Sequence, residues 1–168
     1  MKALTDIEIR GSIVNATRGE AERMPLPGLH EVLWEEREYL GWRDPGAPQR
    51  GYLVVWHDGE PVGIVLRAAE SRSHVGSAMC SLCQLSQPAS QVTLFTAARA
   101  GDAGRAGNTV GTYICSDLAC SMLIRIAPAP YGAGFGVRHD RDELIAQRVA
   151  GLAERVGAFA ARVLAPAP

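Results

Sequence analysis

Two paired runs of apolar residues define the central part of the chain. The first pair is separated by a polar turn at Asp58 and Gly59, a dipeptide that favours tight hairpins. The second pair is rich in β-branched and aromatic side chains and flanks a glycine-rich stretch, which we expect to be a turn-forming loop. The pattern predicts antiparallel strands at about 51–57, 61–68, 91–98 and 109–114. We expect them to form one sheet, or two small ones, with helices against it.

An apolar stripe near the N-terminus predicts a helix over residues 5–24. Thr5 and Glu8 form a capping box at its start, and Leu4 and Ile9 can form the hydrophobic staple that accompanies it. Two prolines follow residue 24 and are expected to end the helix. Residues 28–50 predict a short helical or irregular piece and then a turn-rich linker. Its large apolar side chains are expected to anchor the core, namely Trp34, Tyr39, Leu40 and Trp42.

The last part of the chain, 138–164, predicts one long amphipathic helix with Asp140 and Glu143 as its capping pair. Its apolar positions recur in steps of four and three, at Ile145, Val149, Leu152, Val156, Phe159 and Val163. This spacing puts them on one seam of the helix. A seam of this kind packs either on the core of its own chain or on a second copy, so a dimer through this helix stays open.

The chemistry of the chain is concentrated in its four cysteines, Cys80, Cys83, Cys115 and Cys120. They form two closely spaced pairs, and four thiolates in this pattern suit a tetrahedral zinc ion. Two alternatives are buried free thiols and a redox pair of the thioredoxin type, although no βαβ pattern precedes the first pair. His74 is a further alternative ligand.

The context of the second pair indicates a treble clef. Cys115 ends a predicted strand, and Cys120 lies in the first turns of a predicted helix over 116–127 that Ser116 can cap. That helix would present one apolar face, made by Leu118, Met122 and Ile126. A treble clef has three parts in order. They are a tight turn with the first two ligands, here Cys80 and Cys83 and called the knuckle, then a hairpin, and then a helix with the last ligands. With four protein thiolates no position is open to water, so the predicted zinc is structural.

The composition of the chain excludes a disordered tail, a collagen-like fibre and a low-complexity linker. The chain has 47% hydrophobic and 21% charged residues and a net charge of −1, which is typical of a globular protein. We expect no membrane span and no signal peptide, and therefore a cytoplasmic protein. Neither the glycine-rich stretch 132–136 nor any other segment matches a nucleotide-binding or catalytic motif. We therefore expect that the protein is not an enzyme.

Together these patterns predict an α+β fold, in which antiparallel hairpins and a four-cysteine treble-clef zinc finger lie between N-terminal and C-terminal helices. The predicted organisation has an N-terminal helix and connecting segment at 1–50. A β-hairpin and zinc-finger domain follows at 51–127, and an amphipathic helix at 138–164 ends the chain.

Several segments resemble the elongation factor G-binding family, which includes the fusidic-acid-resistance proteins. The similar segments lie at 17–27, 39–55, 79–83 and 98–125. The resemblance implies a C-terminal treble-clef zinc finger, with the family's zinc ligands at the four cysteines of this chain. It also implies a protein that binds elongation factor G on or near the ribosome and can help to release it. Residues 1–50 are shorter than the helical domain that precedes the finger in the resistance proteins.

The candidate partner-binding surface is the glycine-rich loop, with Arg99, Arg105 and Asn108, together with Arg125 after the second cysteine pair. Arginine makes planar, bidentate contacts to carboxylate or phosphate. Ordinary solvated arginines, and an asparagine that supplies a positive φ, are the alternative interpretations. Residues 61–125 carry a net charge of only +2. This favours a protein partner, although an RNA-binding treble-clef module that contacts ribosomal RNA is the second hypothesis.

Overall fold

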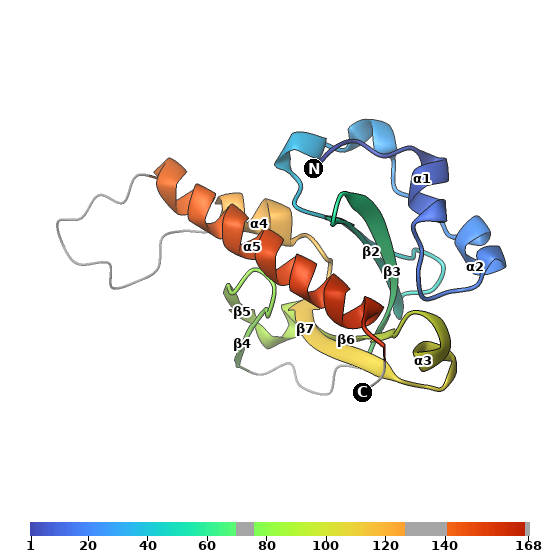
Figure 1. The fold of residues 1–168 in the computed structure, drawn as a ribbon. Coiled ribbons are helices and arrows are strands. Elements are labelled where there is room, and N and C mark those ends of the chain that lie inside the picture. Colours follow the sequence, from blue (N-terminus) through green and yellow to red (C-terminus); the bar gives the residue numbers. More distant parts are fainter. Residues whose placement is uncertain (70–75, 127–140, 167–168) are drawn as a thin grey trace.

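A five-stranded antiparallel sheet forms the centre of the structure, a computed structural model that describes residues 1–69, 76–126 and 141–166 (Figure 1). Its strand order is β1-β2-β3-β6-β7. The bounds are β1 Leu40–Arg43, β2 Arg50–His57, β3 Glu60–Ala68, β6 Val92–Ala98 and β7 Thr109–Cys115. A separate two-stranded sheet joins β4 Ser77–Met79 to β5 Ser86–Pro88. The α-helices are α1 Asp6–Gly11, α2 Arg18–Arg23, α3 Gly101–Arg105, α4 Cys120–Ile126 and α5 Arg141–Leu164. Short 3₁₀ turns are η1 Leu29–Glu31, η2 Trp34–Glu36 and η3 Ala89–Gln91.

Both predicted hairpins are confirmed. In the first, β2 and β3 pair along their length, and the turn residues Asp58 and Gly59 have φ of 50° and 85°. Positive φ at both positions matches the right-handed twist of the strands and explains the Asp-Gly sequence. In the second, β6 and β7 pair from Val92 with Cys115 to Ala98 with Thr109. This pairing brings Cys115 to the end of the sheet nearest the knuckle.

The two faces of the sheet belong to two separate hydrophobic clusters. One face contributes Leu53, Ile64 and Phe95 to a cluster that also contains the cysteines and the buried residues of α5. The other face contributes Trp42, Tyr52 and Val54 to a cluster with the N-terminal segment, including Leu4 and Ile9. Strands with apolar side chains on both faces need a cover on each side. The N-terminal segment and α5 supply these covers (Figure 1).

The predicted seam of the last helix is a core contact of its own chain. α5 contacts α4, β2, β3 and β7. The four residues of the seam nearest the C-terminus are fully buried, namely Leu152, Val156, Phe159 and Val163. Ile145 and Val149 are partly exposed. Asp140, the predicted cap, lies outside the described residues.

The prediction of one helix over 5–24 is wrong: α1 and α2 are two short helices. The predicted capping box at Thr5 is present, but Thr17 starts α2 with a second capping box. Between the helices the chain runs beside β3, where Ser12 O accepts from Gly63 N and Val14 N donates to Gly63 O, both at 2.9 Å. These hydrogen bonds to β3 replace the hydrogen bonds that a continuous helix would make. The break between α1 and α2 therefore depends on a strand that is distant in the sequence.

The segment between α2 and β2 contains a strand that the sequence did not predict. Residues 28–39 form the two short turns η1 and η2, and the chain then extends into β1, which pairs with β2. The predicted core anchors Tyr39, Leu40 and Trp42 are buried, and Trp34 is partly exposed. β1 alternates between buried and partly exposed residues, and such alternation over only four residues is a weak signal.

Two further local predictions need correction. The glycine-rich stretch after Arg99 is not a plain loop, because it contains the one-turn helix α3. The helix that follows β7 begins at Cys120 rather than at Ser116. The hydroxyl oxygen of Ser116 instead lies 2.6 Å from the hydroxyl oxygen of Thr93. Its buried residues are Cys120, Ser121 and Ile124, whereas Met122 and Ile126 are exposed. The predicted apolar face was therefore wrong.

No helix among the described residues is both long and apolar enough to cross a membrane. The division of the chain into segments at 1–50, 51–127 and 138–164 stays a prediction.

Candidate metal centre

The first two cysteines lie in a tight turn between β4 and β5. Cys80 O accepts a hydrogen bond from Gln84 N at 2.9 Å, and Gln84 has a positive φ of 57°. This turn reverses the chain within five residues. The backbone N–H groups of Leu82 and Cys83 both donate to Cys80 Sγ, at 3.4 Å. Such donors stabilise a thiolate, which is the form that binds metals.

The other two cysteines flank a second turn between β7 and α4. Leu118 N donates to Cys115 O at 2.9 Å, and Leu118 takes a left-handed φ of 59°. This conformation is uncommon for a leucine, and the surrounding structure holds it. Tyr39 Oη donates to Leu118 O at 2.9 Å. In β1, a Cβ on Gly41 would lie 2.8 Å from the same carbonyl oxygen. A glycine there lets the strand approach the turn that presents Cys115 and Cys120.

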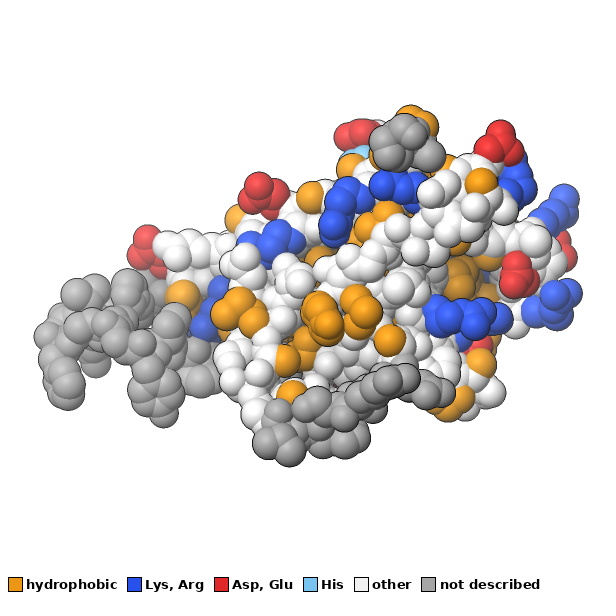
Figure 2. Space-filling view, turned by 90° about the horizontal axis from the view of Figure 1, so that it is seen from below, with side chains coloured by type: hydrophobic (Ala, Val, Ile, Leu, Met, Phe, Trp, Pro, Cys, Tyr) orange, Lys and Arg blue, Asp and Glu red, His pale blue; other side chains and the backbone are white. Residues whose placement is uncertain are grey.

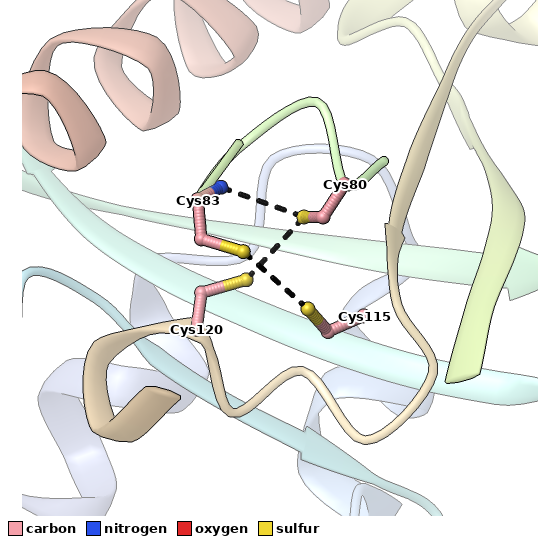
Figure 3. Close-up of side chains that lie close together, drawn as sticks. All are labelled: Cys80, Cys83, Cys115 and Cys120. Atoms are coloured by element: carbon pink, nitrogen blue, oxygen red, sulfur yellow. Dashed lines mark hydrogen bonds between the residues drawn. The ribbon is translucent and has the colours of Figure 1, made fainter. Parts of the chain in front are cut away.

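The four sulfurs point toward one another from these two turns (Figure 3). Cys80 Sγ lies 3.7 Å from Cys120 Sγ, and Cys83 Sγ lies 3.6 Å from Cys115 Sγ. All four ligand atoms are within 4.8 Å of one another, and all four residues are buried. A disulfide would need about 2.05 Å, so these thiols are free. Zn–S bonds of about 2.3 Å place tetrahedral sulfurs ~3.8 Å apart, so the cluster has the size of a zinc site.

The charges of the cluster also suit a divalent cation. Hydrogen bonds with the thiols of Cys115 and Cys120 lower the pKa of Cys80. Hydrogen bonds with Cys115 and Cys80 raise the pKa of Cys120. Four adjacent buried thiols cannot all lose their protons unless a cation offsets the repulsion. Zinc would supply that charge, and the four cysteines would hold it with no position left for water.

Contacts around the cysteines connect the centre to the rest of the fold. Gln87 of β5 donates its side-chain amide to Cys115 Sγ at 3.1 Å. Arg155 of α5 donates from Nε to the carbonyl oxygen of Leu82, in the knuckle, at 2.5 Å. Neither residue belongs to a sequence motif, so the cysteine pattern alone could not identify them. Partners of this kind orient metal ligands. His74, the alternative ligand, lies outside the described residues.

A knuckle, a β-hairpin and a helix that begins with the last cysteine define this chain as a treble-clef zinc-finger protein with one structural zinc. The chain matches the family described as FBP C-terminal treble-clef zinc-finger over residues 8–163. It therefore belongs to this family. The match confirms the predicted fold class and the family resemblance of the sequence.

Comparisons with solved structures and with curated proteins add less information than the family match. Two solved chains match, one of them the fusidic acid resistance protein FusC. It is 22% identical, with a TM-score of 0.46, over 60% of this chain and 45% of FusC. This chain thus covers less than half of FusC. No curated protein matches the chain.

The structure does not gather the four candidate partner-binding residues at one place. Arg105 is exposed in α3, where it pairs with Asp102. Asn108 Nδ2 donates to Ala103 O at 3.1 Å. Arg99 Nη1 donates to the carbonyl oxygens of Arg162 and Ala165, at 2.7 and 3.1 Å. It therefore caps the end of α5.

Arg125 lies in α4, well away from α3 (Figure 1). Its guanidinium makes two hydrogen bonds to the carboxylate of Glu38, at 2.8 and 3.1 Å. The hydrogen bonds to Glu38 raise the pKa of Arg125. The carboxylate side chain is only 5% exposed, so the pair ties the zinc-finger helix to the segment before β1.

We expect Arg125→Gln to destabilise the protein by about 2 kcal/mol, because it leaves the Glu38 carboxylate largely buried without a cation. Urea unfolding at neutral pH measures the loss. Arg18→Gln is the matched control, since it removes an exposed pair with Glu22 that is expected to contribute ~0.5 kcal/mol. Equal losses in the two variants would contradict a structural role for Arg125.

Proposed function

We propose that this protein binds elongation factor G on or near the ribosome and modulates its release, with the interface on the zinc-finger side. The observation that carries this proposal is the family match across residues 8–163. A zinc held by four protein thiolates has a structural role, which favours a binding module over a catalyst.

The zinc-finger side exposes side chains of the types found in protein interfaces. Met79 of β4 is 62% exposed and Tyr113 of β7 is 54% exposed. Figure 2 shows hydrophobic side chains near the centre of one face, with basic side chains around them and acidic ones toward the periphery. Tyr, Met and Arg are enriched in the centres of interfaces. A surface with this charge distribution suits an acidic partner.

Arg105 is the candidate residue that a binding test can address most cleanly. Its side chain is 72% exposed, and its ion pair with Asp102 is local and exposed. Exposed pairs contribute little to stability, so a partner can exchange this pair for one of its own carboxylates at small cost. Arg99 and Arg125 are tied to α5 and Glu38, so their substitution would mix folding with binding.

We expect Arg105→Glu to weaken binding to purified elongation factor G by about 30-fold, as loss of a buried arginine anchor costs ~2 kcal/mol. Zinc content and unfolding should not change. Titration calorimetry at two salt concentrations measures the affinity, and Arg18→Glu, an equally local exposed pair on α2, is the control.

Three outcomes would overturn parts of the proposal. No binding of the factor by the parent protein would reject the partner. Unchanged binding by Arg105→Glu would move the interface away from α3. Tight binding of ribosomal RNA fragments with a steep salt dependence, and none of the factor, would favour the RNA-binding alternative.

A further inference from the structure

A hollow opens beneath α2 where β3 and β6 part. These strands pair only at Arg67 with Thr96 and at Ala68 with Phe95. Beyond that point, Asn15 Nδ2 donates to both Val65 O and Ala98 O, each at 3.0 Å. The asparagine thus fills a gap that ladder hydrogen bonds would otherwise close. The hollow has a volume of about 400 Å³.

Two arginines lie directly opposite each other in the lining of this hollow. Arg50 of β2 and Arg67 of β3 are register partners, and both line it. Side chains of opposed residues share one face of a sheet, and like charges in such positions repel. Neither arginine takes part in an ion pair among the described residues. An anion between them would remove this repulsion.

Glu20 is the acidic residue of the lining, and its carboxylate already has partners. Glu20 Oε2 accepts from Thr17 N at 2.9 Å and from Thr17 Oγ1 at 2.8 Å. The backbone hydrogen bond from Thr17 lowers the pKa of Glu20, so the group is charged at neutral pH. It belongs to the capping box of α2. The lining therefore keeps a net charge of +1. Arg50 hydrogen-bonds to the Tyr52 hydroxyl and is attracted by Glu20, so its charge is only partly offset.

We propose that this hollow binds a phosphate group. Arginine forks match the geometry of phosphate, and the doubly charged phosphate can accept from two guanidinium groups at once. A single carboxylate offers one bidentate edge and one charge. Thr96 and Thr109 add hydroxyl groups to the lining. A hollow of this volume falls within the range of small-molecule sites, so inorganic phosphate or a small phosphomonoester fits it.

Titration calorimetry of the full zinc-loaded chain tests the site, with inorganic phosphate, ribose 5-phosphate and ribose as probes at constant ionic strength in chloride. We expect both phosphates to bind and ribose not to bind. Tighter binding of ribose 5-phosphate would identify a phosphomonoester as the ligand, and tighter binding of inorganic phosphate would identify the free ion. The double substitution Arg50→Gln with Arg67→Gln should weaken phosphate binding at least tenfold.

Glu20→Gln provides an independent measurement, because it removes the opposing charge and keeps an oxygen for Thr17. We expect it to strengthen phosphate binding several-fold. Arg18→Gln, outside the hollow, should leave the affinity unchanged. No binding by the parent beyond that of chloride, or equal binding by the double variant, would overturn the site. Binding of single-stranded RNA through the two arginines, without binding of either small phosphate, would also overturn it.

Discussion

Replacing Cys115 by serine should release the zinc ion and unfold at least residues 78–126. Binding of structural zinc contributes about 10–16 kcal/mol in zinc-finger peptides, and a whole domain is stable by only ~5–15 kcal/mol. The cysteines here belong to the same buried cluster as α5 and the central sheet. The loss should therefore extend into the core, which we expect amide hydrogen exchange and elemental analysis to show together.

Ser81→Ala is the matched control for this experiment. Ser81 is an exposed residue of the same knuckle, between Cys80 and Cys83, and it offers no thiolate. The variant should keep one zinc per chain and the unfolding midpoint of the parent. A chelator should unfold the parent protein in the same way as Cys115→Ser. A reduced, folded parent that contains no metal would contradict the structural zinc.

Val156→Asp should cost at least ~3 kcal/mol of stability, the second large effect that we expect. Val156 is fully buried in α5, among residues of the main core cluster. An ionised carboxylate without partners in such surroundings costs several kcal/mol. Urea unfolding measures the loss, and a variant that fails to fold counts as the expected result.

Ala158→Asp tests whether the effect belongs to the seam rather than to α5 as a whole. Ala158 is exposed on the same helix, so the change should remain within about 0.5 kcal/mol. If Val156→Asp were equally mild and only halved the mass of the protein in solution, the seam would instead be a contact between two copies. The oligomeric state of the protein stays a prediction until that mass is measured.

Local patterns were sufficient where a residue and its partners are close in the chain. The turn at Asp58 and Gly59 predicted the first hairpin because positive φ is a property of the dipeptide itself. The capping box at Thr5 could be predicted for the same reason, because Glu8, the partner of Thr5, is only three residues away. The closely spaced cysteines indicated zinc because each pair lies within one turn.

Predictions failed where a distant segment competes with a local preference. The stretch 12–15 bonds to Gly63 and Val65 of β3 rather than continuing the helix. The capping box of Thr17 and Glu20 was a local signal for a second helix, but the interruption before it depends on β3. Arg125 had the sequence context of an exposed end of a helix, but its partner Glu38 lies 87 residues earlier. Neither pairing has a local signal, since side-chain reach and burial create it only after the sheet has formed.

The class of this protein could be assigned from its sequence, because the cysteines, the Asp-Gly turn and the apolar seam of α5 each act through short-range geometry. Which surfaces are free depends on long-range contacts that only the folded chain makes. Burial beside Glu38 and the end of α5 ties down Arg125 and Arg99, and leaves Arg105 exposed. The pairing of β2 with β3 also places Arg50 opposite Arg67, and the sequence does not show this register. Charged side chains take their roles from the neighbours that folding brings to them.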